Sequence, residues 1–285
     1  MNNIIPNLEA LDQKTPGQVY LCQVNYHVAC GACCGLYNIK DLSEENLVTL
    51  LNRRTDVFGK TQRSEEDIDG FADFISRTES RYRPLKSFHH CPFIGFPDRN
   101  KPVVGCLLHP LADGNDGVDY RGLSYYGGYA CRSYFCPTVY QLPYNHKKIL
   151  RVAAPNWYLY GLVITEFEML KRFFEIIESR LGKPTDSDTA IHTPNALEPI
   201  TQIFFLKTTW PYRKKGAPIP INDVINHQTY EFLWESIDYH KLKLKPSIWT
   251  PVFHALNSIF TSAQEVMKAE EQLDRLVHQF LYHLK

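Results

Sequence analysis

Hydrophobic positions in the second half of the chain recur with the 3.6-residue period of an amphipathic helix. The clearest stretch predicts a helix over 159–181, which ends at Gly182 because Gly182 and Pro184 cannot continue it. Two further helices are predicted over 196–208 and 228–238. A last apolar stripe begins near residue 247, and Ser262 divides it into two predicted helices.

The first half contains two shorter helical patterns and then a region with none. A capping box formed by Asp41 and Glu44 predicts a helix over 45–52. A second polar helix is predicted to start near Ser64, with its buried side made of Ile68, Phe71, Phe74 and Ile75. Between Pro84 and Pro143, proline and glycine recur so often that no helix of ordinary length fits.

These patterns predict a mainly α protein with an irregular N-terminal region. An α+β fold with a low strand content is the alternative. We expect one boundary between two regions, with the irregular, Cys-rich region over 1–145 and a helical region over 146–285.

Charge and hydropathy argue against a nucleic-acid-binding protein and against a membrane-spanning one. The 31 Lys and Arg residues balance 31 Asp and Glu residues, so no overall electric field attracts nucleic acid. No run of about 18 apolar residues predicts a membrane-spanning helix. The first residues lack the apolar core of a secretory signal, and we therefore expect a cytoplasmic protein.

The eight cysteines are the unusual part of the composition, because all of them lie within the first 136 residues. A disulfide framework is one interpretation of this even number, but it is typical of small secreted proteins. Burial as small apolar side chains is a second interpretation, and it suits Cys22. A metal or iron–sulfur site is the third and the one that we favour.

The spacing favours the metal site because a Cys-x-x-Cys turn, here Cys30 and Cys33, lets two thiolates reach one centre. Adjacent residues rarely direct both side chains to one metal, so the choice between Cys33 and Cys34 stays open. Cys136 is either a further ligand or a buried thiol. The predicted metal ligands are drawn from Cys30, Cys33, Cys34, Cys91, Cys106, Cys131 and Cys136. The four that we favour are Cys30, Cys91, Cys106 and Cys131, followed by Cys33 or Cys34.

Four short motifs follow one another in an order that resembles the CxxCxxCC family of zinc- or iron-chelating proteins, also called YkgJ-like. They read Cys30-Gly-Ala-Cys33-Cys34-Gly35, Cys91-Pro-Phe-Ile94, Gly105-Cys106 and Cys131-Arg132-Ser-Tyr134. The resemblance covers about 27–136. His27 stands where the family has its first cysteine. It has either a structural role or a role as a metal ligand, and the same two alternatives apply to His109. A Gly- and Asp-rich insertion runs from Leu108 to Gly128.

The resemblance implies a [4Fe–4S] cluster, with Zn²⁺ as the alternative, since thiolate ligands from loops suit both. Arg132 is a candidate cofactor-binding residue, because a guanidinium stabilises an anionic cluster. The histidines at 89 and 90, just before Cys91, are expected to be solvated.

Three functions follow. A redox or sensing role through the cluster comes first. A structural zinc module for protein partners is the second. The third is a protein-lysine N-methylase that uses S-adenosylmethionine, as the resemblance to flagellin lysine N-methylases implies, although no Gly-x-Gly-x-x-Gly turn supports a Rossmann-type site. The expected partner is a protein substrate or a redox partner.

Overall fold

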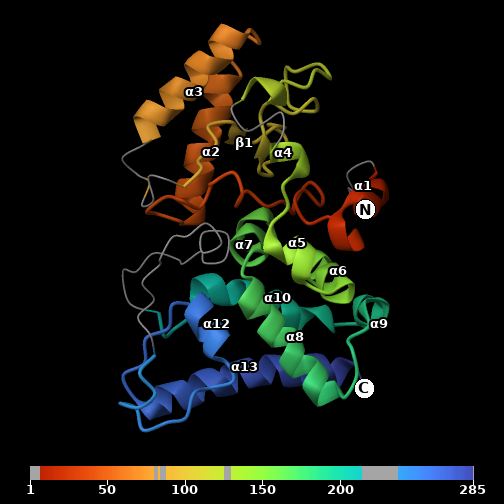
Figure 1. Cartoon of the computed structure of the whole chain (residues 1–285), viewed down its shortest axis with the longest axis vertical. Helices are drawn as coiled ribbons and strands as arrows, with labels where there is room; N and C mark the ends of the chain where they lie inside the picture. Colours follow the sequence, from red (N-terminus) through yellow and green to blue (C-terminus); the bar gives the residue numbers. More distant parts are fainter. Residues whose placement is uncertain (1–6, 80–82, 84–87, 125–129, 214–236, 285) are drawn as a thin grey trace. The chain divides into compact units, whose positions relative to one another are not determined.

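The computed structural model describes residues 7–79, 83, 88–124, 130–213 and 237–284 (Figure 1). The chain divides into two compact units. The first unit consists of Met1–Leu8, Cys22–Cys136 and Asn156–Gly161, and the second of Glu9–Leu21, Pro137–Pro155 and Leu162–Lys285. The chain therefore leaves the first unit after Cys136 and returns to it once, for six residues.

The first unit contains two long helices, a minimal sheet and several turns. Its elements are α2 (Glu44–Phe58), α3 (Glu65–Glu79), β1 (Ile94–Gly95), β2 (Gly105–Cys106), the 3-10 turn η3 (Arg121–Leu123) and α4 (Ala130–Ser133). The strands β1 and β2 pair antiparallel, with Ile94 opposite Cys106. Two-residue strands and short turns agree with the predicted lack of ordinary helices in this stretch.

Both long helices begin at a serine. The Ser43 Oγ accepts the Asn46 N–H over 3.4 Å, and the Ser64 Oγ accepts the Asp67 N–H over 3.1 Å. The predicted cap at Asp41 is wrong, because its carboxylate instead accepts the Ser43 N–H just outside the helix. The helix α2 also continues past residue 52 to Phe58, where its last turns are buried.

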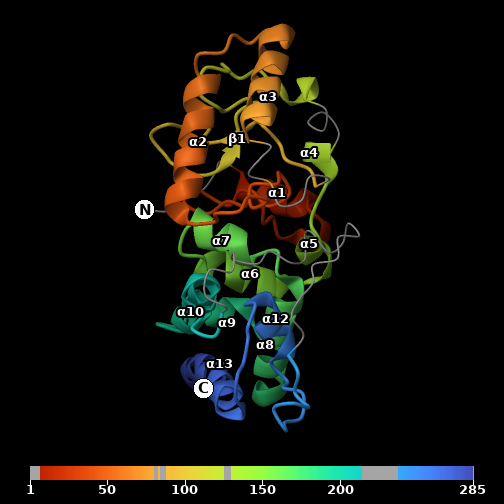
Figure 2. The same ribbon diagram turned by 90° about the vertical axis from the view of Figure 1, so that its left-hand side faces the viewer.

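Helices α2 and α3 lie side by side in both views (Figures 1 and 2) and enclose one end of the first unit's core. Phe58 and Phe71 meet edge to face with ring centroids 5.1 Å apart, and Phe71 stacks on Phe93 at 5.6 Å. Cys91 belongs to the same buried cluster. This core therefore fixes the loop that carries Cys91.

The returning segment supplies part of α7 (Trp157–Val163) to the first unit. The Tyr158 hydroxyl donates to the Leu42 carbonyl oxygen over 2.8 Å, and Trp157 meets Phe96 edge to face at 5.8 Å. A Cβ on Gly161 would lie only 1.6 Å from the Tyr37 hydroxyl oxygen, so glycine is required there.

The second unit is built from helices alone among its described residues. They are α1 (Leu8–Lys14), the 3-10 turn η1 (Pro16–Gln18), α5 (Pro137–Gln141), α6 (Tyr144–Ala153), α8 (Phe167–Leu181), α9 (Ser187–His192), α10 (Leu197–Thr209), α12 (Thr250–Ala255) and α13 (Ala263–His283). The long helix α13 packs against α8 and α10, and α8 also packs against α12 (Figure 1).

Several predictions for this half are confirmed. Helix α8 ends at Gly182, whose φ of +73° places it in the left-handed region. Helix α10 matches the predicted 196–208, and Ser262 caps α13 by accepting the Glu265 N–H. Most of the predicted helix 228–238 lies outside the described residues.

The single helix predicted over 159–181 is wrong, because the chain breaks between α7 and α8. Glu166 lies at the break, is 1% exposed and forms a buried ion pair with Lys207. Lys207 also donates to the Ala255 carbonyl oxygen over 2.7 Å. A buried pair of this kind depends on tertiary contacts and leaves no mark on the hydrophobic period.

The fold class is confirmed as mainly α with very little strand. Of the helices that the structure describes, none has both the length and the hydropathy needed to cross a membrane.

Candidate metal centre

All eight cysteines belong to the first unit, and each is a free thiol. The disulfide framework that their even number allows is therefore not formed. Cys91 and Cys136 are buried, Cys131 is exposed, and the other five are half-buried.

The loop of Cys34 contacts the loop of Cys91, because the Cys91 N–H donates to the Cys34 carbonyl oxygen over 2.8 Å. Cys106 lies on β2, where it faces Ile94 of β1, and Cys131 lies on α4. Burial raises the pKa of the Cys34 thiol well above its usual value, and Cys91, Cys106 and Cys131 raise it further, in that order.

Gly35 lets the two loops approach each other. Its φ is +74°, and a Cβ there would lie 2.0 Å from the His89 carbonyl oxygen. Any other residue after Cys34 would push the loop of Cys91 away. The glycine is thus needed for the position of the Cys34 thiol.

Burial has the largest effect on the Cys91 and Cys106 thiols and raises their pKa values to about 11 and about 12. The backbone groups of Phe93 and Ile94 act in the opposite direction at Cys91, and that of Leu108 does so at Cys106. Backbone groups that lower the pKa of a thiol favour its thiolate form.

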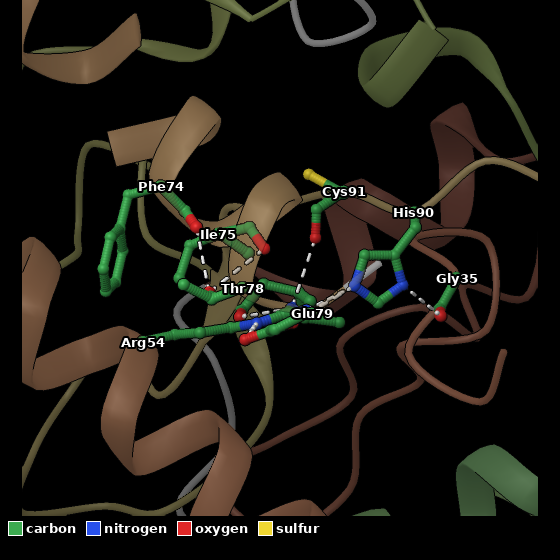
Figure 3. A network of polar contacts seen from close by, with 9 residues as sticks. Gly35, Arg54, Phe74, Ile75, Thr78, Glu79, His90 and Cys91 are labelled. Atoms are coloured by element: carbon green, nitrogen blue, oxygen red, sulfur yellow. Dashed lines mark hydrogen bonds and ion pairs between the residues drawn. The ribbon is translucent and has the colours of Figure 1, made fainter. Parts of the chain in front are cut away.

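A buried network of polar contacts fixes the backbone of the Cys91 loop (Figure 3). Arg54 on α2 is fully buried and pairs through two nitrogen atoms with the carboxylate of Glu79 at the end of α3. The Arg54 Nη1 also donates to the carbonyl oxygens of Cys91, over 3.2 Å, and Ile94, over 3.3 Å. One side chain therefore ties both long helices to the loop.

His90 joins this network to the loop of Cys34. Its Nδ1 donates to the Gly35 carbonyl oxygen over 3.1 Å, and its Nε2 accepts from the Arg54 Nη2. A carbonyl only accepts, so Nδ1 carries a proton, while Nε2 faces the Arg54 Nη2 and lies 3.4 Å from the Glu79 Oε2. The expectation that His90 is solvated is wrong, since it is 7% exposed.

Positive charge lies near the same thiols. Burial and the N–H of Phe93 have larger effects on Cys91, but the Arg54 charge also lowers the pKa of this thiol. Arg121, paired with Asp119 over 2.7 Å, lowers the pKa values of Cys106 and Cys131 against the larger effect of burial. A cluster with four thiolate ligands is anionic, so these cations would stabilise it.

Burial has the largest effect on the thiols of Cys22, Cys30 and Cys33 and raises their pKa values. At Cys33 the thiols of Cys136, Cys30, Cys22 and Cys34 raise the pKa further, in that order. The adjacent residues Cys33 and Cys34 are therefore affected most by different thiols.

The remaining candidate residues either make other contacts than these cysteines or have side chains outside the described part of the chain. His27 is exposed at the turn of a hairpin, and its backbone N–H donates to the Asn25 side chain over 2.7 Å. The Nδ1 of His109 accepts the Leu111 N–H over 3.1 Å, which leaves Nε2 for any other partner. Arg132 lies on α4, but its side chain is outside what the structure describes.

As the side chains stand, no three His, Cys, Asp or Glu residues in the described ranges converge closely enough to hold one ion. The chain matches no protein-family model, no curated protein and no solved structure.

Arg54 and Glu79, which hold the Cys91 loop, are residues that sequence reasoning missed. Arg54 and Glu79 are charged residues within helical patterns, where such residues normally face water. The only available signal was the motif around Cys91, because a loop with one buried cysteine needs partners for its backbone carbonyls.

Proposed function

We propose that the chain carries a [4Fe–4S] cluster with a redox or sensing role, held by Cys34, Cys91, Cys106 and Cys131. The observation that supports this most is the backbone hydrogen bond that joins the Cys34 and Cys91 loops. The thiols of Cys91, Cys106 and Cys131, from three other segments of the first unit, also raise the pKa of Cys34. Four thiolates are the usual ligand set of such a cluster.

The surroundings of these thiols fit an anionic group. Backbone groups lower the pKa values of Cys91 and Cys106 against the larger effect of burial, and the Arg54 and Arg121 charges act in the same direction. Phe93 and Leu107, both buried, keep water from the Cys91 side. When bound, the cluster would supply one-electron transfer.

Cys131 gives the centre an accessible edge. It is the only exposed cysteine of the eight, and it lies on the short helix α4. Electron exchange with another protein needs close approach to one edge of a cluster, so we propose that a redox partner binds over α4. The other three ligands are held by buried backbone.

The test is the metal content of the full chain purified without oxygen. We expect about four iron and four sulfide per chain, with broad visible absorption and a paramagnetic signal after reduction. Cys91→Ser and Cys106→Ser should each remove most of this iron. His27→Ala is the matched control and should leave it unchanged, because His27 is exposed at the hairpin turn.

Two results would contradict the proposal. Colourless protein with zinc and without iron would identify a structural zinc module instead. Full iron content in Cys91→Ser would show that the ligand set is wrong.

A further inference from the structure

A pocket with a volume of about 220 Å³ lies in the first unit, between the end of α2, the loop after β1 and the insertion after Leu108. Phe58, Phe96 and Leu107 form its apolar wall, and all three are buried. Phe58 and Leu107 belong to the same core cluster as Cys91, which fixes this wall. The volume is that of roughly seven water molecules at about 30 Å³ each, so it fits a small molecule.

Arg63 lines the pocket with a guanidinium that other groups hold in place. Its Cζ lies 4.1 Å from the centroid of the Phe58 ring. Its Nε donates to the Asn115 Oδ1 over 2.7 Å, and its Nη1 donates to the carbonyl oxygens of Phe58 and Thr61. Its Nη2 donates to the Asp113 carbonyl oxygen over 3.3 Å.

All four of these acceptors are neutral oxygen atoms, although Arg63 is a cation. They use the N–H of Nε, both N–H groups of Nη1 and one of the two on Nη2, so one N–H has no acceptor among the described residues. Burial lowers the pKa of Arg63, and only the smaller effects of Tyr120 and Asp116 oppose it. The guanidinium is therefore fixed in position and can still bind an anion.

Arg99 brings a second guanidinium to the same pocket. Its Nη2 donates to the Thr55 carbonyl oxygen over 3.4 Å and lies 3.7 Å from the carboxylate of Asp56, whose side chain is 65% exposed. A Cβ on Gly59 would overlap this nitrogen, so the glycine leaves room for Arg99. The Nε and Nη1 of Arg99 form no hydrogen bond with the residues that the structure describes, and its side chain is half exposed.

The charges of the lining do not balance. Its acidic residue is Asp113, whose Oδ2 accepts the backbone N–H of Arg99 over 3.0 Å. Two guanidinium groups and one carboxylate thus line a pocket whose remaining wall is apolar. A ligand with one negative charge restores the balance, and a guanidinium binds a carboxylate with matching geometry.

We propose that this pocket binds a small carboxylic acid with an apolar body, of the aromatic or branched-chain class. The ligand carboxylate accepts hydrogen bonds from Arg99 and from the free N–H of Arg63. The apolar body lies against Phe58, Phe96 and Leu107, and an apolar wall with a few polar groups is the usual construction of a small-molecule site. The site is independent of the proposed metal centre.

Benzoate is the probe, and benzyl alcohol and inorganic phosphate are its controls. In a nuclear magnetic resonance titration of the full chain, benzoate should shift the amide signals of Gly59, Phe96 and Gly114, with a Kd of about 1 mM or tighter. Benzyl alcohol keeps the ring without the charge, and phosphate keeps the charge without the ring. Each should therefore bind at least about tenfold more weakly than benzoate. Absence of these shifts, or equal binding of either control, would overturn the proposal.

Substitutions then locate the site. Arg99→Met should weaken benzoate binding at least about tenfold, because it removes the accessible charged donor. Arg77→Met is the matched control and should bind as the wild type does, since Arg77 is exposed on α3 and donates to the Asp73 carbonyl oxygen of its own helix. Both replaced side chains are exposed, so the two variants should unfold at the same urea concentration as the wild type. Wild-type affinity in folded Arg99→Met, or equal losses in both variants, would refute the site.

Discussion

Replacing Glu79 by glutamine tests the buried network behind the Cys91 loop. The change keeps the shape of the side chain and removes its charge, so Arg54 stays buried with no anion beside it. Arg54 is 0% exposed and Glu79 is 2% exposed, so water cannot replace the lost partner. Removing one partner of a buried ion pair costs about 3–5 kcal/mol in other proteins.

The pKa of Glu79 gives a second measure of the same interaction. Burial raises it, but hydrogen bonds with His90 and Arg54 and the Arg54 charge bring it from 4.5 down to about 2. At about 1.4 kcal/mol for each pKa unit, the whole difference corresponds to about 3 kcal/mol. Because part of this difference comes from His90, which the substitution leaves in place, we expect about 2–3 kcal/mol from the loss of the Arg54 pair.

The assay is urea unfolding of the wild type and of Glu79→Gln between pH 7 and pH 2. The pKa of Glu79 is lowered by folding, so its contribution is complete above about pH 4.5 and is lost as the pH falls through about 2. The difference between the two proteins should therefore shrink in this range.

Glu66→Gln is the matched control, since Glu66 is exposed in the first turn of the same helix. It should change the free energy of unfolding by less than about 1 kcal/mol. A cost for Glu79→Gln no larger than that of Glu66→Gln, or one independent of pH, would refute the reasoning.

Two further predictions concern packing and a buried ion pair. Gly161→Ala should destabilise the protein by about 1–3 kcal/mol despite the higher helix propensity of alanine, because its Cβ would meet the Tyr37 hydroxyl. Urea unfolding should show partial recovery with Tyr37→Phe, and full stability of Gly161→Ala alone would contradict the contact. Lys207→Met should lower the free energy of unfolding by about 3–5 kcal/mol, because it removes the cation paired with the buried Glu166 carboxylate. The control Lys148→Met should lower it by less than about 1 kcal/mol, because the Asp188 side chain of that pair is 73% exposed. Equal midpoints for the two lysine variants would disprove this difference.

The sequence predicts the helices whose apolar positions face one core. Helices α10 and α13 follow from their hydrophobic period, and Gly182 and Ser262 mark helix boundaries through their own backbone and side-chain chemistry. The break before α8 cannot be predicted from the sequence, because Glu166 is buried there by its ion pair with Lys207, a tertiary contact. The pattern around the break alone is that of a continuous helix.

The candidate site is predictable to a similar extent. The motifs identify which cysteines are unusual, but the contact between the Cys34 and Cys91 loops depends on the tertiary fold. Arg54 cannot be found from its spacing, because a helical arginine is normally solvated. Its burial follows only from the folded positions of Glu79 and the Cys91 loop.

The return of the chain to the first unit has a consequence for biosynthesis. All eight cysteines have been translated by residue 136, yet Leu42 and Phe96 also have partners within 156–161. Translation at about 5–20 residues per second delays this segment by a few seconds. A nascent chain that ends at residue 155 therefore has every thiol and still lacks the last segment of the first unit.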